Sequence, residues 1–376
     1  MSYGNPAART LPDFPWDRLV PFGDIARKHP DGIVDLSIGT PVDPTPQVIQ
    51  DALAAATNAP GYPTTVGLPE LREAARAWFE RCLGVTALDI DAIIPSIGSK
   101  EIVAWLPTLL GLTARDVVAI PATAYPTYDV GARIAGCSVL TADTVGELEA
   151  LRNKAEASGR RLAMAWVNSP SNPTGRVLSA EELRSIVEWG RAHRVLIVSD
   201  ECYLELGWDV TPVSVLHPSV IGDSLEGVLA VHSLSKRSNL AGYRAGVVAG
   251  DRSVIAAILE IRKHAGMILS MPVQRAAIVA FNDDAHVAAQ REVYRARREV
   301  LKSAFSNAGF EIQFSHAGLY LWVTRGENCW ITVEWLAERG ILVAPGSFYG
   351  SAGEQFVRVA MTATDERIGR VAERLS

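Results

Sequence analysis

Two patterns of hydrophobic and polar residues alternate through the middle of the chain. Short, almost wholly apolar runs read DVVAIP (116–121), RLAMAWVN (161–168), RVLIVSD (194–200) and GVLAVHS (227–233). Between them lie amphipathic segments with apolar residues at helical spacing. Short apolar runs that alternate with helices are typical of parallel strands covered on both faces, so the pattern predicts an α/β fold with a mostly parallel sheet.

Helix start signals occur between these predicted strands. Thr144 and Glu147 match a capping box, in which a hydroxyl side chain and a glutamate three residues later bond free amides of the first turn. Ser179 and Glu182 match it as well. One match arises easily by chance, but two that fall where the strand pattern requires helices predict a helix start at each place.

The last third of the chain has a different pattern. The stretch from about 273 to 307 is rich in alanine and arginine, and we expect one long helix that connects two domains. After it, GLYLWVT, ILVAPGSFYG and FVRVAM read as strands or strand ends of a smaller α+β unit. We therefore predict a large domain over 46–275 and a small domain composed of 1–45 and 276–376.

Composition narrows the class of protein. The chain has 376 residues, 48% of them hydrophobic and 21% charged, which is ordinary for a soluble folded protein of about two domains. Its net charge of −6 gives no reason to expect nucleic acid or an anionic membrane as partner. The N-terminal segment lacks the basic start and apolar block of a secretion signal, and no apolar run reaches membrane-spanning length, so we expect a cytoplasmic protein.

Cysteine and histidine spacing argues against a disulfide framework or a metal site. The four cysteines are far apart and form no CxxC pair, so reduced thiols are expected. The seven histidines form no HExxH or HxH motif.

Polar residues follow the predicted strands directly. Asp200 closes one strand and precedes Tyr203, Asn172 follows another, and Lys236 follows a third. Singly, each has an ordinary explanation as a cap, a half-buried aromatic, a turn former or a surface cation. Ligands bind outside the carboxyl ends of strands in open α/β sheets, so these four residues are expected to meet in one crevice.

The chemistry of this set is specific. Lys236 lies in HSLSKRSNLAGYRAG (232–246) among small and hydroxylated residues, where an uncharged amine able to form a Schiff base is favoured. A carboxylate such as Asp200 can hold a pyridine nitrogen protonated and make the ring an electron sink. This division of labour is that of pyridoxal phosphate chemistry.

A phosphate also needs a binding site. SIGSKEIVAWL begins a helix after Gly98, which would put the amides of Ser99 and Lys100 where anions are favoured. Ser233 and Arg244 flank Lys236 and add a hydroxyl and a permanent cation.

The ordered motifs resemble the class I/II aminotransferases. They are Y-x-x-x-x-G (62–67), G-S-K (98–100), Y-P-x-Y (125–128), N-P-T-G (172–175), D-x-x-Y (200–203), S-x-S-K (233–236) with an arginine at 244, and F-x-R (356–358). The resemblance covers nearly the whole chain. It implies the fold-type I architecture of α/β class, with a mostly parallel seven-stranded sheet, a smaller α+β domain and pyridoxal 5'-phosphate as cofactor.

The resemblance also implies a role for each cofactor residue. Lys236 would form the Schiff base and move the reacting proton, while Asp200 would pair with the pyridine nitrogen. Tyr203 and Asn172 would hydrogen-bond the cofactor O3', and Tyr125 would stack on the ring. The phosphate would be surrounded by Gly98, Ser99, Lys100, Ser233, Ser235 and Arg244.

Three further roles rest on the resemblance alone. Arg358 would bind the substrate α-carboxylate, with the backbone near Gly39 closing over it. Tyr62 would reach the phosphate of a neighbouring subunit, which implies a homodimer with shared sites. From the residues alone, Arg358 could equally be a surface cation, and Tyr62 and Tyr125 could equally be core aromatics.

The substrate is a finer question. FPWDRL, DLSIGTPVDPTP and SKRSNLAGYRAG are most similar to bacterial N-succinyldiaminopimelate aminotransferases. Such an enzyme transfers an amino group between N-succinyl-LL-2,6-diaminopimelate and 2-oxoglutarate in lysine biosynthesis. Lys263, Arg237 and Arg275 are candidates for the distal carboxylates, but a solvated or structural charge is the more ordinary explanation of each. The resemblance implies that the segment around Leu319 and Tyr320 lines the distal pocket, although its apolar character does not single out a dicarboxylate.

Other functions stay open at this point. The same cofactor residues occur in aspartate, alanine and aromatic aminotransferases, and in β-lyases that expel a β-substituent. A non-catalytic regulator that kept the fold is the alternative from another class. The absence of a visible DNA-binding extension and the presence of the lysine, aspartate and arginine argue against it.

Overall fold

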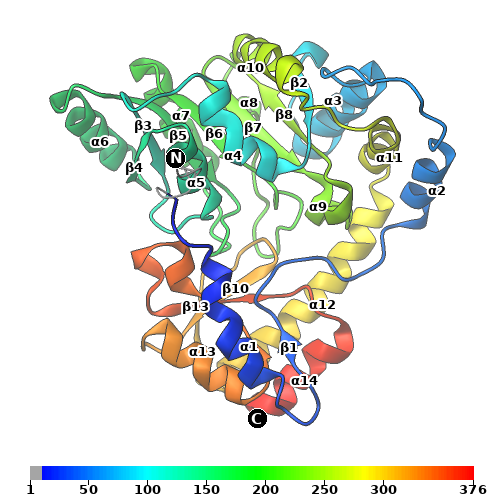
Figure 1. Ribbon diagram of the computed structural model, residues 1–376, viewed down its shortest axis with the longest axis vertical. Coiled ribbons are helices and arrows are strands. Elements are labelled where there is room, and N and C mark those ends of the chain that lie inside the picture. Colours follow the sequence, from blue (N-terminus) through cyan, green and yellow to red (C-terminus); the bar gives the residue numbers. More distant parts are fainter. Residues whose placement is uncertain (1–10) are drawn as a thin grey trace, which may run out of the picture.

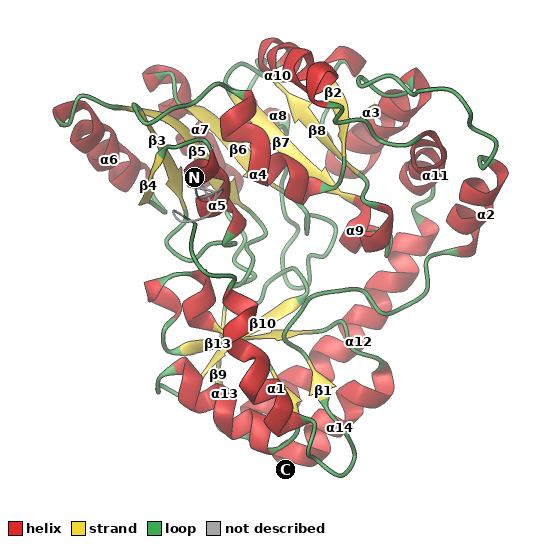
Figure 2. Cartoon of the chain, in the orientation of Figure 1, coloured by secondary structure: helices red, strands yellow, loops and turns green. Residues whose placement is uncertain are grey.

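The computed structural model describes residues 11–376. The expectation that the N-terminal segment is not a secretion signal concerns residues 1–10 in part, and these lie outside the described range. Figures 1 and 2 show two layered parts, with a sheet and its helices above and a second, smaller sheet with its helices below.

The upper part is built on a seven-stranded sheet of order β2-β8-β7-β6-β5-β3-β4. All neighbouring pairs from β7 to β4 are parallel, whereas β8 runs antiparallel to both of its neighbours. The four strands predicted from apolar runs are all present in it, and β2, β4 and β8 complete it. The bounds are β2 (Ile93–Ser96), β3 (Asp116–Ile120), β4 (Ser138–Thr141), β5 (Arg161–Asn168), β6 (Leu196–Asp200), β7 (Val228–Ser233) and β8 (Gly246–Gly250).

Helices cover both faces of this sheet, which explains its nearly continuous apolar strands. One face packs against α4 (Ser99–Leu109), α5 (Thr127–Ile134) and α10 (Arg252–Ala265). The other packs against α3 (Pro69–Leu83), α6 (Val145–Ala157), α7 (Ala180–His193) and α11 (Met271–Asn282). The upper part also contains α2 (Gln47–Ala55), α8 (Pro218–Ile221) and α9 (Leu234–Arg237).

The lower part has a separate hydrophobic core. Its antiparallel sheet has the order β12-β13-β10-β9, with bounds β9 (Glu311–Gln313), β10 (Tyr320–Thr324), β12 (Ala344–Pro345) and β13 (Phe356–Ala360). A parallel pair joins β1 (Val34–Asp35) to β11 (Ile341–Leu342). Around them lie α1 (Val20–Ala26), α12 (Ala285–Asn307), α13 (Cys329–Glu338) and α14 (Asp365–Leu375). The proposed domain boundaries at 45/46 and 275/276 stay a prediction.

The two predicted capping boxes are confirmed, but the prediction of a single connecting helix is wrong. Thr144 caps α6 and Ser179 caps α7, each with both reciprocal bonds. The stretch 273–307 instead forms two helices, because Asp283 has an extended backbone and its carboxylate accepts a bond from the Ala285 amide, 2.8 Å away, at the start of α12. Aspartate competes for backbone amides in this way, so the Asp283–Asp284 pair ends one helix and begins the next.

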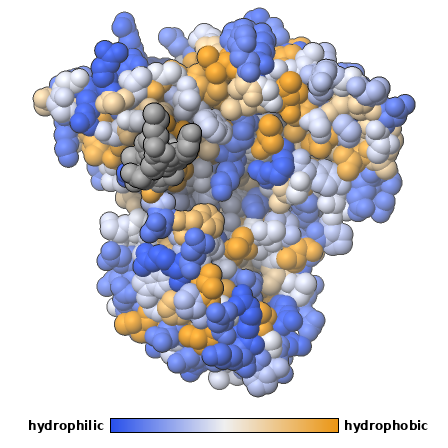
Figure 3. All heavy atoms as spheres, viewed as in Figure 1, coloured by the Kyte–Doolittle hydropathy of each residue, from blue (hydrophilic) through white to orange (hydrophobic). Residues whose placement is uncertain are grey.

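Several absences can be stated for the described part of the chain. No helix between residues 11 and 376 is both long and apolar enough to span a membrane. The same residues contain no cluster of three or more potential metal ligands, and all four cysteines are unpaired. On the face shown in Figure 3, apolar side chains are scattered among polar ones.

Candidate active site

A cavity of about 590 Å³ lies where the carboxyl ends of β5, β6 and β7 face β10 and β13. Its size is within the usual range for ligand pockets. Residues from both parts of the molecule and from the N-terminal segment line it. Among the predicted site residues, the lining includes Gly39, Ser99, Lys100, Tyr125, Asn172, Asp200, Tyr203, Ser233, Ser235, Lys236, Arg244 and Arg358.

Lys236 lies in the short helix α9, directly after β7. Its ammonium donates a hydrogen bond to the Gly39 carbonyl, which belongs to the segment after β1. Burial lowers the pKa of the Lys236 amine, and the cations Arg358 and Arg244 lower it further, against the opposing effect of Tyr320. A lowered pKa increases the fraction of neutral amine, the form that attacks a carbonyl carbon.

Asp200 is the last residue of β6 and is buried. Its Oδ2 accepts a hydrogen bond from the Tyr128 hydroxyl at 2.8 Å, and its Oδ1 accepts one from the Cys202 amide at 3.2 Å. Burial raises the pKa of this carboxyl. No lysine, arginine or histidine among residues 11–376 forms an ion pair with it, and the nearby His232 lies against Glu201 instead. The Tyr128 and Cys202 hydrogen bonds partly offset the rise.

Tyr128 is a residue whose role the sequence did not reveal. It is fully buried in α5 and stacks on Trp166 of β5, with ring centroids 4.9 Å apart. Tyr125, three residues earlier, packs edge-on against it and lines the cavity. The i, i+3 spacing in YPTY was the available signal, because it predicts that both rings lie on one face of a helix.

The loop after β5 is tied to the end of β6. Asn168, at the end of β5, donates to the Asp200 carbonyl at 2.9 Å and accepts from the Asn172 amide at 2.7 Å. The Asn172 side chain is thereby held in the cavity, where its Oδ1 accepts a bond of 3.0 Å from Arg358.

A group of donors lies at the start of α4. Gly98 has a φ of 72°, and a Cβ there would lie 2.5 Å from a guanidinium nitrogen of Arg244. Only glycine permits this close approach at a positive φ. The free amides at the start of α4, the Ser99 hydroxyl and the exposed Arg244 fork therefore face one place, which suits a phosphate.

Arg358 is a buried cation in the middle of β13. Its guanidinium lies 4.0 Å from the centroid of the Tyr320 ring and donates to the Ser37 carbonyl at 2.7 Å. Its Nε has no hydrogen-bond partner, and no carboxylate among residues 11–376 pairs with it. A buried guanidinium without an acid is costly unless an anion binds, and its fork matches a carboxylate.

Tyr203 and Tyr320 connect the two parts of the cavity. Their hydroxyls are 3.0 Å apart, and both side chains are buried. Burial raises the pKa of the Tyr203 phenol. Burial acts in the same direction on Tyr320, but the nearby cations Arg358 and Lys236 bring the pKa of that phenol below its ordinary value.

Several expected positions lie away from the cavity. Lys263 pairs with Glu260 and Arg275 with Glu70 on the surface, while Arg237 is buried against Glu205. None of these three cations lines the cavity, and their charges are paired elsewhere, as expected for solvated or structural charges. Of the proposed distal wall, Tyr320 lines the cavity and Leu319 is buried in the neighbouring core.

Tyr62 does not line the cavity of its own chain. It is fully exposed in the loop between α2 and α3.

The residues present fit pyridoxal phosphate by charge. Counting partners within residues 11–376, the cavity contains a carboxylate without a counter-cation, a buried guanidinium without an acid, a lysine amine with lowered pKa and a donor group at a helix start. A pyridinium, a substrate carboxylate, an aldehyde and a phosphate are their respective complements. Asp200, Lys236, and the start of α4 with Arg244 could hold the cofactor, while Arg358 is left for the substrate.

The sheet order and the site at its carboxyl edge define a fold-type I transferase. The chain belongs to the aminotransferase class I and II family, whose family model matches residues 31–375. It is similar to an aminotransferase structure from Neisseria meningitidis, with 30% identity, a TM-score of 0.88 and 99% of each chain covered. The predicted family, fold and cofactor are confirmed, and the protein is a pyridoxal-phosphate-dependent aminotransferase.

Curated relatives are similar along almost the whole chain. The probable aminotransferase Rv1178 of Mycobacterium tuberculosis is 57% identical over 98% of this chain and 86% of its own length. The 4-dedimethylamino-4-oxo-anhydrotetracycline transaminase OxyQ of Streptomyces rimosus is 55% identical over 98% of this chain and 100% of its own length. The LL-diaminopimelate aminotransferase of Gloeobacter violaceus is 33% identical, with 96% of each covered.

Proposed function

We propose that this aminotransferase uses N-succinyl-LL-2,6-diaminopimelate and 2-oxoglutarate, or the reverse pair, in lysine biosynthesis. The observation that carries the transamination site is the buried Arg358, which lacks an acid and lines the same cavity as Lys236. The cavity volume of about 590 Å³ allows a long substrate. The similarity to an LL-diaminopimelate aminotransferase favours a substrate of that chemistry.

Each residue has a defined task in this proposal. When bound, pyridoxal phosphate supplies an electron sink for the charge that develops at the substrate α-carbon. Arg358 and the Asn172 amide orient the amino acid through its α-carboxylate, and the Gly39 segment excludes water above it. Lys236, as a neutral amine, takes the proton from the α-carbon and returns it on the other side of the transferred nitrogen.

Asp200, Tyr203 and Tyr125 act on the cofactor ring in this scheme. Asp200 would hold the proton on the pyridine nitrogen, which requires that its carboxylate stay ionised. Tyr203 would donate to the O3' atom, and Tyr125 would cover one face of the ring. Gly98, Ser99, Lys100, Ser233, Ser235 and Arg244 hold the phosphate.

A second substrate class is supported by the outer wall of the cavity. Phe14, Pro15, Trp16 and Ile38 line it with apolar surface. This apolar surface, together with the 55% identity to the 4-dedimethylamino-4-oxo-anhydrotetracycline transaminase OxyQ, favours a substrate with an extended apolar ring as the alternative to the diaminopimelate derivative.

Two assays test the substrate. The absorbance of the purified holoenzyme with glutamate added reports the first half-reaction without an acceptor. Steady-state kcat/KM is then compared for N-succinyl-LL-2,6-diaminopimelate, aspartate, alanine and phenylalanine, each with 2-oxoglutarate. We expect a preference of roughly a hundredfold for the first, because contacts along the whole substrate contribute to specificity. A preference for phenylalanine would favour the apolar class, and release of pyruvate and ammonia without an acceptor would indicate a β-lyase.

We also propose a homodimer with shared sites. Tyr62 is fully exposed on its own chain, as expected for a residue that completes a neighbour's phosphate site. Light scattering should give twice the monomer mass of 40.5 kDa. A monomer with full activity would contradict this proposal.

A further inference from the structure

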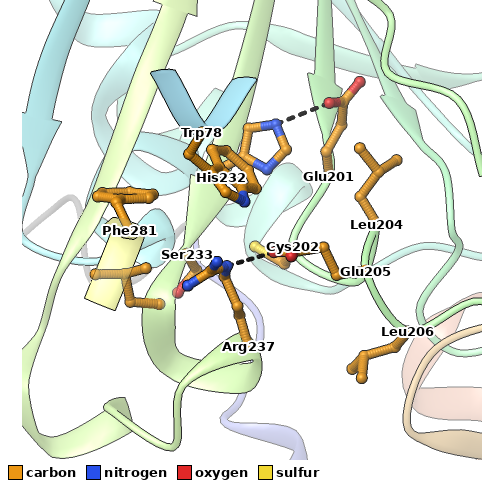
Figure 4. A pocket seen from close by; sticks show the side chains of 11 residues that line it. Trp78, Glu201, Cys202, Leu204, Glu205, Leu206, His232, Ser233, Arg237 and Phe281 are labelled. Carbon is orange, nitrogen blue, oxygen red and sulfur yellow. Dashed lines mark hydrogen bonds and ion pairs between the residues drawn. The ribbon is translucent and has the colours of Figure 1, made fainter. Parts of the chain in front are cut away.

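A small buried space lies directly behind the cavity wall. Cys202 and Ser233 line both the cavity and this space, whose volume of about 10 Å³ has room for one water molecule at most. Figure 4 shows that its walls contain two pairs of an acidic and a basic side chain, beside the rings of Trp78 and Phe281.

The first pair joins the ends of β6 and β7. The His232 ring lies 2.8 Å from a Glu201 carboxylate oxygen, and the two side chains are 6% and 1% exposed. Glu201 also accepts bonds from the Ser214 hydroxyl at 2.8 Å and the Val215 amide. The His232 and Trp78 rings pack edge to face, with their centroids 4.9 Å apart. Glu201 thus accepts hydrogen bonds from the Ser214 hydroxyl and the Val215 amide, while the His232 Nε2 beside it makes no hydrogen bond within the described residues.

The second pair joins the segments that follow these strands. The Arg237 guanidinium, 4% exposed, pairs with Glu205. It also donates to the Ala280 carbonyl and lies 3.3 Å from Asp284, both from the region where α11 ends. Its central carbon, Cζ, lies 5.4 Å from the centroid of the Trp78 ring. Trp78 therefore contacts the basic member of both pairs.

The positions of these residues in the chain link them to the cofactor site. Glu201 follows Asp200, and His232 precedes Ser233. Arg237 follows Lys236, and Glu205 comes two residues after Tyr203. Each pair thus connects a neighbour of the Asp200–Tyr203 segment to a neighbour of the Ser233–Lys236 segment, on the side away from the cavity.

We propose that the pairs His232–Glu201 and Arg237–Glu205, with Trp78 in contact with both, are positioning residues for the cofactor site. We name these five residues the side-chain platform. The last backbone bond between the two segments runs from the Glu201 amide to the Val231 carbonyl, 2.9 Å apart. The His232–Glu201 contact lies beside this bond, and the Arg237–Glu205 pair lies beyond it, where side chains hold the spacing of the two segments. That spacing determines whether the Asp200 carboxylate and the Lys236 amine reach opposite ends of one cofactor ring.

Buried ion pairs are a poor source of stability, since desolvation of both charges offsets much of their attraction. Their retention in this place is better explained by geometry. A pair fixes distance and direction between two segments, which an apolar contact of the same size does not.

The test compares cofactor binding with the stability of the cofactor-free protein. Arg237→Gln leaves Glu205 buried without a partner, so the apoprotein should melt at a lower temperature and bind pyridoxal phosphate roughly tenfold more weakly. In the double variant Arg237→Gln/Glu205→Gln no charge is left unpaired, so the melting temperature should recover. If the platform positions the site, this double variant should still have a higher dissociation constant for the cofactor than the wild type. The pH midpoint of the bound cofactor's absorbance should also still differ from the wild-type value.

Control variants separate positioning from folding. Arg298→Gln removes another buried arginine, which pairs with Asp209 away from the cofactor segments, and should lower the melting temperature alone. His232→Gln tests the other pair if the Arg237 variants do not fold, and a raised dissociation constant is expected. A double variant, or His232→Gln, with wild-type cofactor affinity and absorbance midpoint would overturn the proposal. Both measurements use pyridoxal phosphate alone, so the outcome does not depend on the proposed substrate.

Discussion

The two sheets supply functional residues in different ways. In the seven-stranded sheet, Asp200 ends a strand, while Asn172 and Lys236 follow strands. In the four-stranded sheet, Arg358 lies in the middle of β13, opposite Trp322 of β10. The parallel sheet therefore collects its chemistry at one edge, whereas the antiparallel sheet presents an arginine from within a buried strand.

This difference has a physical cause. Parallel strands covered by helices on both faces leave only their ends for polar side chains, so a polar residue after an apolar run is conspicuous. An arginine in an alternating strand such as FVRVA is typical of an exposed face, and its burial is visible only once the opposing part of the molecule is placed.

The largest effect is expected at the edge of the parallel sheet. Lys236→Ala removes the group that moves the reacting proton, so kcat should fall by at least roughly a thousandfold. Binding of the cofactor through its phosphate should persist, which equilibrium dialysis can measure. Turnover close to that of the wild type would contradict the assignment of this edge as the reacting site.

A somewhat smaller loss is expected for Asp200→Ala. Removing the carboxylate weakens the electron sink, and kcat should fall by roughly a hundredfold while the melting temperature of the apoprotein changes little. An unchanged rate would mean that the pyridine nitrogen is held by another group.

Arg358→Gln tests the antiparallel sheet. The α-carboxylate loses its bidentate partner, so kcat/KM for amino acids should fall by roughly a hundredfold, chiefly through KM. Arg298→Gln, a buried arginine outside the cavity, is the matched control and should leave kcat/KM unchanged. Equal losses in both variants would mean that Arg358 matters for folding only.

The smallest expected effect concerns the pKa of Lys236, which follows a strand of the parallel sheet, and its dependence on Tyr320 of the antiparallel sheet. Burial lowers the pKa of Lys236 below the ordinary 10.5, so between the two values the unfolded chain binds more protons and apoprotein stability rises with pH. The rate at which the apoprotein captures pyridoxal phosphate should likewise reach its midpoint below that of N-acetyl-lysine in solution. Tyr320→Phe removes a group that raises the pKa of Lys236, so the midpoint should move further down. An upward movement would contradict this coupling.

Sequence patterns predicted part of this molecule well. The four apolar runs and the two capping boxes correspond to elements with nearly the expected ends. The predicted connecting helix failed because Asp283 bonds backbone amides locally, which interrupts a strongly helical composition. The sequence left open whether Arg237, next to Lys236, is a ligand-binding or a structural charge, and the fold pairs it with Glu205 behind the cavity.

The sequence by itself determined the α/β class, the strand-end residues and, through its ordered motifs, the family. These features depend on local periodicity and on residues close together in the chain. Only the tertiary structure decided which charges are paired and which are left for ligands. Within residues 11–376, Asp200 and Arg358 have no oppositely charged partner, while Arg237 has Glu205, because pairing depends on contacts between segments far apart in sequence.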